Sequence, residues 1–265
     1  MNALDRARHR RAFAPILVAL ALLAWAALWI WSRSAQARWL THDDWTAVGP
    51  AAALCRAWPG TALALTLLAS SGAWVLMILA MMLPTMVPLV GTFERVVAAR
   101  SDRVRLLVLL VLGYVGAWGA FGLLAHGARA LLMAGVDRSP WLSAHGALVG
   151  AGLLALAGAF QFSRLKERCL DRCRSPVSFV TSHWHGRAAA RQAFLLGVDH
   201  GVFCVGCCWA LMLLTFLVGM GSLAWMLALG TVMAVEKNVA WGPRLSGPVG
   251  AALLVGAVGL AATSV

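Results

Sequence analysis

Long apolar stretches, separated by short polar and basic segments, dominate the chain. They lie near residues 13–31, 62–90, 104–125, 141–162, 193–217, 221–238 and 247–264. About 20 apolar residues in a helix span the hydrocarbon core of a bilayer, and continuous runs of this length favour helices over strands. The pattern therefore predicts an all-α, polytopic transmembrane helical bundle with about seven spans.

The segments between these stretches are too short to form a separate soluble domain. The longest cover residues 32–61 and 163–192, and neither a long repeat nor a low-complexity segment occurs along the chain. We therefore expect a single membrane domain that covers residues 1–265.

The basic residues indicate how the spans are oriented. If the N-terminus is cytoplasmic, 17 of the 22 Lys and Arg residues lie on the inner side, and the excess alternates at every crossing. Cytoplasmic loops of membrane proteins carry such an excess. We therefore expect a multi-pass protein of the bacterial inner membrane, surrounded by the lipid bilayer, with its N-terminus in the cytoplasm.

The first stretch also has features of a signal peptide, because a basic start and an apolar run precede Ala35-Gln36-Ala37. Its apolar run is, however, longer than that of a usual signal peptide. It also carries Trp25, Trp29 and Trp31, and tryptophan is typical of the membrane interface. We therefore expect a retained membrane anchor rather than a cleaved leader.

Composition supports a membrane protein and excludes other classes. The chain is 61% hydrophobic and 12% charged, with a mean hydropathy of +0.80, whereas roughly a quarter of the residues in soluble domains are charged. The net charge of +12 does not indicate a nucleic-acid partner, because the basic residues lie between apolar spans rather than on one compact face. A secreted enzyme and a DNA-binding module are therefore excluded.

The fifth span carries the strongest candidate chemistry, in His200, Cys204, Cys207 and Cys208. With His200 at zero on a helix, the cysteines fall at about 40°, −20° and 80°, so the four donors share one stripe. Free cysteines often pack as small apolar residues, but an ionisable group inside a membrane is costly without a role. Thiolates select Cu(I), and thiol with imidazole also suits Zn(II). The stripe therefore predicts a copper site, with zinc as the alternative.

The second span adds thioether sulfur. Met81 and Met82 precede Pro84 and Pro88, and two prolines this close predict a bend in the helix. A bent, methionine-lined helix beside the fifth span would complete a soft-metal site, although methionine also fills irregular gaps in a core. Both interpretations stay open.

The inner segment after the fourth span contains a second pair of thiols. Cys169 and Cys173 lie one helical turn apart among basic residues. The cytoplasm keeps such a pair reduced, so a structural disulfide is the weaker interpretation. A metal-entry site and an amphipathic basic segment on anionic lipid both fit this pattern.

Polar residues near the membrane surfaces carry weaker signals. Glu236-Lys237 ends the sixth span at the inner boundary, where such a pair is typical of an anchor. A shared exit site on the outer side would use His42, Asp43, Asp44, Cys55, His126 and His145, although their spacing does not require them to converge.

The chain resembles a bacterial family of predicted metal-binding integral membrane proteins. The motifs that carry the resemblance are Met81-Met82-Leu83-Pro84, Cys169-x3-Cys173-Arg174-Ser175-Pro176 followed by Ser182-His183-Trp184, and His200-Gly201-x2-Cys204-Val205-Gly206-Cys207-Cys208-Trp209-Ala210-Leu211-Met212. A member of that family is encoded beside a bacterial tyrosinase and looks like its copper chaperone, so the resemblance implies copper delivery. It also implies metal-ligand roles for Met81, Met82, Cys169, Cys173, His200, Cys204, Cys207 and Cys208.

We therefore predict a non-enzymatic protein that binds Cu(I) and delivers it to a copper enzyme or to the assembly of one. The sequence contains neither a Gly-x4-Gly-Lys-Ser/Thr loop nor an Asp-Lys-Thr-Gly motif, so ATP-driven pumps do not fit. One alternative is a membrane thiol–disulfide oxidoreductase, based on the Cys204-x2-Cys207 spacing, although Cys55 stands alone on the outer side as a relay. Another is a non-catalytic structural or assembly subunit of a larger membrane complex.

Overall fold

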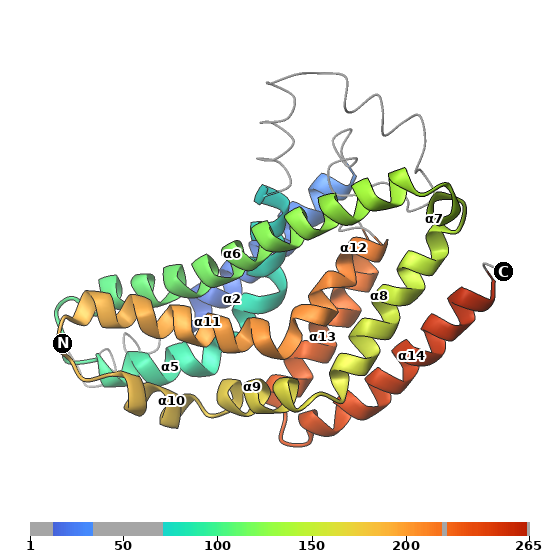
Figure 1. The fold of residues 1–265 in the computed structure, drawn as a ribbon. Coiled ribbons are helices and arrows are strands. Elements are labelled where there is room, and N and C mark those ends of the chain that lie inside the picture. Colours follow the sequence, from blue (N-terminus) through green and yellow to red (C-terminus); the bar gives the residue numbers. More distant parts are fainter. Residues whose placement is uncertain (1–12, 34–70, 219–221, 264–265) are drawn as a thin grey trace.

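The computed structural model describes residues 13–33, 71–218 and 222–263, which form only helices and their connections (Figure 1). The α-helices are α2 (Phe13–Ser32), α5 (Val87–Val96), α6 (Arg103–Arg138), α7 (Pro140–Ala144), α8 (Gly146–Gln161), α9 (Arg164–Arg174), α10 (Pro176–His183), α11 (Ala189–Leu213), α12 (Thr215–Val218), α13 (Leu223–Asn238) and α14 (Ser246–Ala262). A π-helix, η2 (Ile78–Met82), precedes the 3-10 helix η3 (Leu83–Met86), and η4 (Gly242–Leu245) is a second 3-10 helix. The all-α prediction is confirmed for these residues.

Five helical stretches of the described chain are long and apolar enough to cross a membrane. They are Phe13–Ser32, Ser71–Val96, Arg103–Arg138, Ala189–Leu217 and Gly242–Ala262. Gly146–Gln161 and Arg164–Arg174, bent by 62°, would together make a sixth. The helix in the sixth predicted stretch, α13, has 16 residues. The count of seven spans stays a prediction, and Ala35-Gln36-Ala37 and residues 62–70 lie outside the described residues.

The third predicted span is longer than its apolar pattern indicated. The sequence predicted residues 104–125, whereas α6 has 36 residues and continues to Arg138. At 1.5 Å per residue it is about 54 Å long, against about 30 Å for the hydrocarbon core of a bilayer. The helix continues because no proline interrupts it before Pro140.

Glycines allow α6 and α11 to pack side by side at short distance (Figure 1). A Cβ atom on Gly113 would clash with the carbonyl oxygen of Phe194, and one on Gly197 would clash with that of Leu110. Small residues at helix interfaces permit this close approach inside membranes. The packing places Tyr114 of α6 against the cysteine stripe of α11, where its hydroxyl lies 3.0 Å from Cys204 Sγ.

Near the two prolines the second span is irregular, because the π turn η2 is followed by the 3-10 turn η3. Pro84 has no N–H, so the carbonyl group of Ala80 lacks its helical donor. Trp25 Nε1 of α2 donates a hydrogen bond to that oxygen over 3.1 Å. The hydroxyl of Tyr114 donates to the carbonyl oxygen of Met82 over 3.1 Å. Neighbouring helices thus satisfy the irregular backbone and hold Met82 in the centre of the bundle.

Candidate metal centre

The predicted stripe on α11 faces the interior of the bundle. The side chains of His200, Cys204, Cys207 and Cys208 are only 1–3% exposed. The thiols of Cys207 and Cys208 donate to the carbonyl oxygen of Cys204 over 3.1 and 2.9 Å. The helical periodicity that grouped these residues is therefore confirmed, and the thiols lie where water is excluded.

One of the two predicted methionines joins the thiols. Met82 Sδ lies 3.9 Å from Cys208 Sγ. Met81 is also buried, but its side chain lies beside Gly230 of α13. Consecutive residues of a helix point about 100° apart, so only one of the two methionines faces α11.

The helix α9 brings a further thiol to this centre. Cys173 Sγ lies 4.0 Å from Cys207 Sγ, and Cys169, one turn earlier, is buried against Gly206. The sequence offered this pair as a separate entry site or as part of a lipid-bound segment. The structure instead packs the cysteine face of α9 onto α11. We call Met82, Cys173, Cys204, Cys207 and Cys208 the sulfur cluster.

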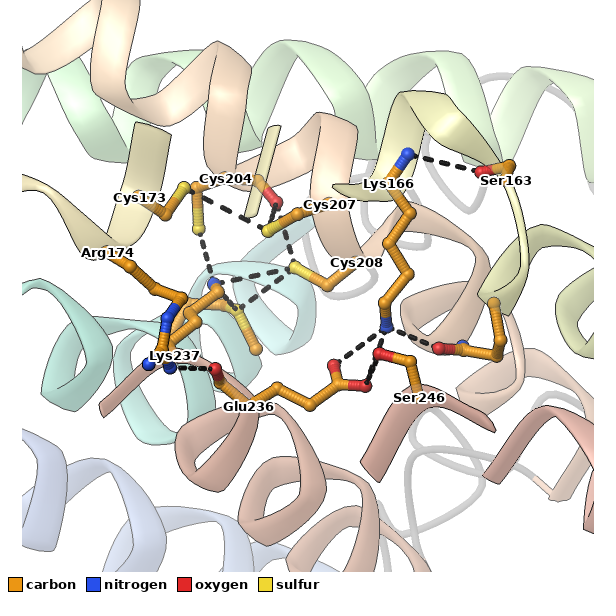
Figure 2. Close-up of polar contacts among 12 residues, drawn as sticks. Ser163, Lys166, Cys173, Arg174, Cys204, Cys207, Cys208, Glu236, Lys237 and Ser246 are labelled. Atoms are coloured by element: carbon orange, nitrogen blue, oxygen red, sulfur yellow. Dashed lines mark hydrogen bonds and ion pairs between the residues drawn. The ribbon is translucent and has the colours of Figure 1, made fainter. Parts of the chain in front are cut away.

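An ammonium group lies within the sulfur cluster, and the sequence reasoning missed it. Lys237 Nζ is 2.8 Å from Cys204 Sγ and 3.6 Å from Cys208 Sγ (Figure 2). The same nitrogen lies 3.9 Å from Met82 Sδ and 3.5 Å from Thr85 Oγ1. The prediction that Lys237 anchors the helix at the membrane surface is wrong, because its side chain is 7% exposed and points into the bundle.

The preceding residue, Glu236, points away from the sulfur cluster and into a network of polar side chains (Figure 2). Lys166 Nζ donates to both of its carboxylate oxygens over 2.8 Å, and also to Gln161 Oε1. Ser246 Oγ donates to Glu236 Oε1 over 2.7 Å. We call Gln161, Lys166, Glu236 and Ser246 the ionic network. Lys166 and Lys237 are the only lysines of the chain, and the other 20 of its 22 basic residues are arginines. This rarity of lysine was visible in the sequence and could have drawn attention to both positions.

Arg174 ties α9 to the end of α13. Its guanidinium donates to the carbonyl oxygens of Glu236 and Val239 over 2.6 and 2.7 Å. The last carbonyl groups of a helix lack helical donors, and a cation there is stabilising. The contact holds Cys173 of α9 and Lys237 of α13 at the same centre.

His200 lies against aromatic rings next to the sulfur cluster. Its ring centroid is 6.0 Å from that of Tyr114 and 5.3 Å from that of Phe179. Its Nδ1 is buried and has no hydrogen-bond partner among the described residues. Among the described residues, no group of three or more His, Cys, Asp or Glu side chains is arranged so that it could bind a single metal ion. The donors that do lie together are sulfur atoms, which are soft ligands.

The outer residues give no common site in the described chain. His126 lies among Trp74 and Phe216, with ring centroids 5.7 and 5.3 Å away. His145 stacks on Trp141 at 4.7 Å. The remaining predicted members, His42, Asp43, Asp44 and Cys55, lie outside the described residues. The exit site stays a prediction.

Together, the fold and the site define a protein that is helical throughout its described residues and that gathers cysteine thiols, a methionine thioether and the ammonium group of Lys237 at one buried centre. The chain belongs to the PpoB2 copper chaperone family, whose model matches residues 71–260. That range contains the whole sulfur cluster, and the family confirms the copper-chaperone resemblance drawn from the motifs. Searches of curated proteins and of solved structures found no match.

Proposed function

We propose that this protein is an integral membrane copper chaperone that binds Cu(I) at the sulfur cluster and delivers it to a copper enzyme or to its assembly. The supporting observation is the convergence of thiols from α9 and α11 with the Met82 thioether on one buried centre. Thiolate and thioether donors select Cu(I). The proposed ligands are the members of the sulfur cluster, and His200 lies next to them. Met81 and Cys169 pack on Gly230 and Gly206 beside the site and are not among the proposed ligands.

Loading of the site is a ligand exchange. Two S–H groups lose their protons, two Cu–S bonds form, and the two bonds from copper to its previous ligands break. Those ligands leave and take up the protons, and the bound ion remains Cu(I). Because the thiols must lose protons, the affinity for copper falls as the pH falls. Delivery reverses these steps when the recipient's ligands replace the thiolates, so the protein transfers copper without catalysing a reaction.

The outer surface of the bundle supports membrane insertion. Large apolar side chains on the helix exteriors are strongly exposed, including Leu124 (72%), Leu131 (78%) and Val255 (72%). Exposed apolar surface of this extent suits contact with lipid. The alternation of basic segments supports an inner-membrane protein with seven spans and a cytoplasmic N-terminus.

Elemental analysis of protein purified in detergent under reducing conditions tests this function. We expect about one copper per chain in the wild type and none in the variant Cys204→Ser/Cys207→Ser/Cys208→Ser, because thiolates supply the soft donors. Cys169→Ser is the matched control, since it removes a buried thiol that packs on Gly206. A wild type without copper contradicts the proposal and favours the role of a structural subunit.

A further inference from the structure

We infer that Lys237 makes the sulfur cluster selective for a monovalent over a divalent metal ion. This inference rests on the proposed copper site and adds a specificity-determining residue to it. The two lysines of the chain differ in what surrounds them: Lys166 contacts a carboxylate, whereas Lys237 contacts thiols.

Lys237 is a buried cation without a carboxylate partner in the described part of the chain. Its Nζ contacts Cys204 Sγ, Cys208 Sγ and Met82 Sδ within 3.9 Å. The nearest carboxylate along the chain, Glu236, already binds Lys166 through both oxygens. The negative charge that balances Lys237 must therefore come from the sulfur cluster itself once its thiols are deprotonated.

The charge of the bound metal ion decides whether the ammonium group of Lys237 is neutralised. A Cu(I) ion on two thiolates carries a net charge of minus one, which the ammonium group of Lys237 neutralises. A Zn(II) ion on the same two thiolates is already neutral, so Lys237 would leave an uncompensated positive charge among apolar side chains. Burying such a charge is unfavourable. The ammonium group also repels a divalent ion twice as strongly as a monovalent ion at the same distance.

The residue type fits this role. An ammonium group is a compact point charge, whereas a guanidinium group is a wide planar fork. Every basic residue other than Lys166 and Lys237 is an arginine, and Lys237 lies among sulfur atoms in the bundle interior. The compact charge therefore lies where a wider group would displace the proposed ligands.

Metal competition tests the inference. Detergent-purified wild type, Lys237→Leu and Lys237→Arg are each incubated with equimolar Cu(I) and Zn(II) under reducing conditions, and elemental analysis gives the bound copper-to-zinc ratio. We expect the ratio to fall at least about tenfold in Lys237→Leu, because the repulsion that disfavours the divalent ion is removed and no new metal donor is added. Lys237→Arg keeps the charge but places a wider group among the ligands, so it should bind less metal in total while the copper-to-zinc ratio stays close to that of the wild type.

A second competition needs no variant. Wild-type protein is offered Ag(I) and Cd(II), which are both soft ions but differ in charge, and it should prefer Ag(I). An unchanged ratio in folded Lys237→Leu, or a wild-type preference for Cd(II), overturns the role of Lys237. If the wild type binds no copper at all, the proposed function itself fails. Elution as a single species in size-exclusion chromatography checks that Lys237→Leu is folded.

Discussion

The ionic network and the sulfur cluster are neighbours at the end of α13 (Figure 2). Lys166 belongs to the ionic network, and Lys237, the other lysine of the chain, lies against the sulfur cluster. In the ionic network, Lys166 has both oxygens of Glu236 as acceptors. In the sulfur cluster, Lys237 faces sulfur atoms and one hydroxyl group. A buried charge with its counter-charge in place fixes how helices pack, whereas Lys237 has no carboxylate partner among the described residues and faces sulfur atoms instead. Changes in the first region should therefore affect stability, and changes in the second should affect metal binding.

The largest expected effect comes from breaking the ionic network. Glu236→Leu leaves Lys166 buried without its counter-ion, and removing one partner of a buried pair typically costs about 3–5 kcal/mol. Thermal unfolding in detergent should show a strongly lowered midpoint. The double variant Glu236→Leu/Lys166→Met removes both charges and should recover much of that loss. Equal midpoints for wild type and Glu236→Leu would show that the network does not hold the bundle together.

The double variant Cys207→Ser/Cys208→Ser should leave the bundle intact and lower the Cu(I) affinity by about a hundredfold or more, because it removes two soft donors. Competition with a chromophoric Cu(I) chelator measures the affinity, and the unfolding midpoint serves as the control. Stoichiometric copper in the double variant under that competition would rule out the sulfur cluster as the site.

The two methionines give a matched pair within one segment. Met82→Leu removes the thioether near Cys208 and should weaken Cu(I) binding by about tenfold, which corresponds to roughly 1.4 kcal/mol. Met81→Leu keeps the volume of a residue that faces α13 and should bind copper as the wild type does. The same chelator competition compares them. Equal losses in both variants would mean that methionine contributes only packing.

The smallest effect is expected for His200→Ala. Its ring lies against Tyr114 and Phe179, and two or three thiolates can hold Cu(I) without imidazole. We expect the Cu(I) affinity to fall only a few-fold, less than in Met82→Leu. A loss as large as that of the double cysteine variant would make His200 a principal ligand, which X-ray absorption of the copper-loaded protein would show as nitrogen coordination.

Features that depend on local sequence were predictable. The stripe of His200, Cys204, Cys207 and Cys208 follows from helical periodicity, and the irregular helix geometry lies at Pro84, where the sequence predicted a disturbance. The positions of helix ends were less accurate, because α6 continues beyond the apolar stretch that marks the span. Hydropathy detects contact with lipid, whereas the end of a helix depends on prolines and caps.

Features that depend on how distant helices dock were not predictable. Cys173 belongs to a strongly basic segment, so its pattern favoured a surface location, and only the packing of α9 on α11 brings it to Cys207. Lys237 likewise ends an apolar helix, where a lysine usually reaches the interface. Here its side chain turns to the thiols of α11, while the adjacent Glu236 meets Lys166.

The dispersed origin of the sulfur cluster also sets the order in which the centre is made. Met82 and Lys237 contact each other although 155 positions separate them, and α13 is the last of the contributing helices along the chain. Chains are synthesised from the N-terminus. A nascent chain shorter than 237 residues therefore carries the cysteines of α9 and α11 before their cationic neighbour exists. The ribosome must therefore complete α13 before Lys237 can join the cysteines, so copper loading at the proposed site would follow the synthesis of α13.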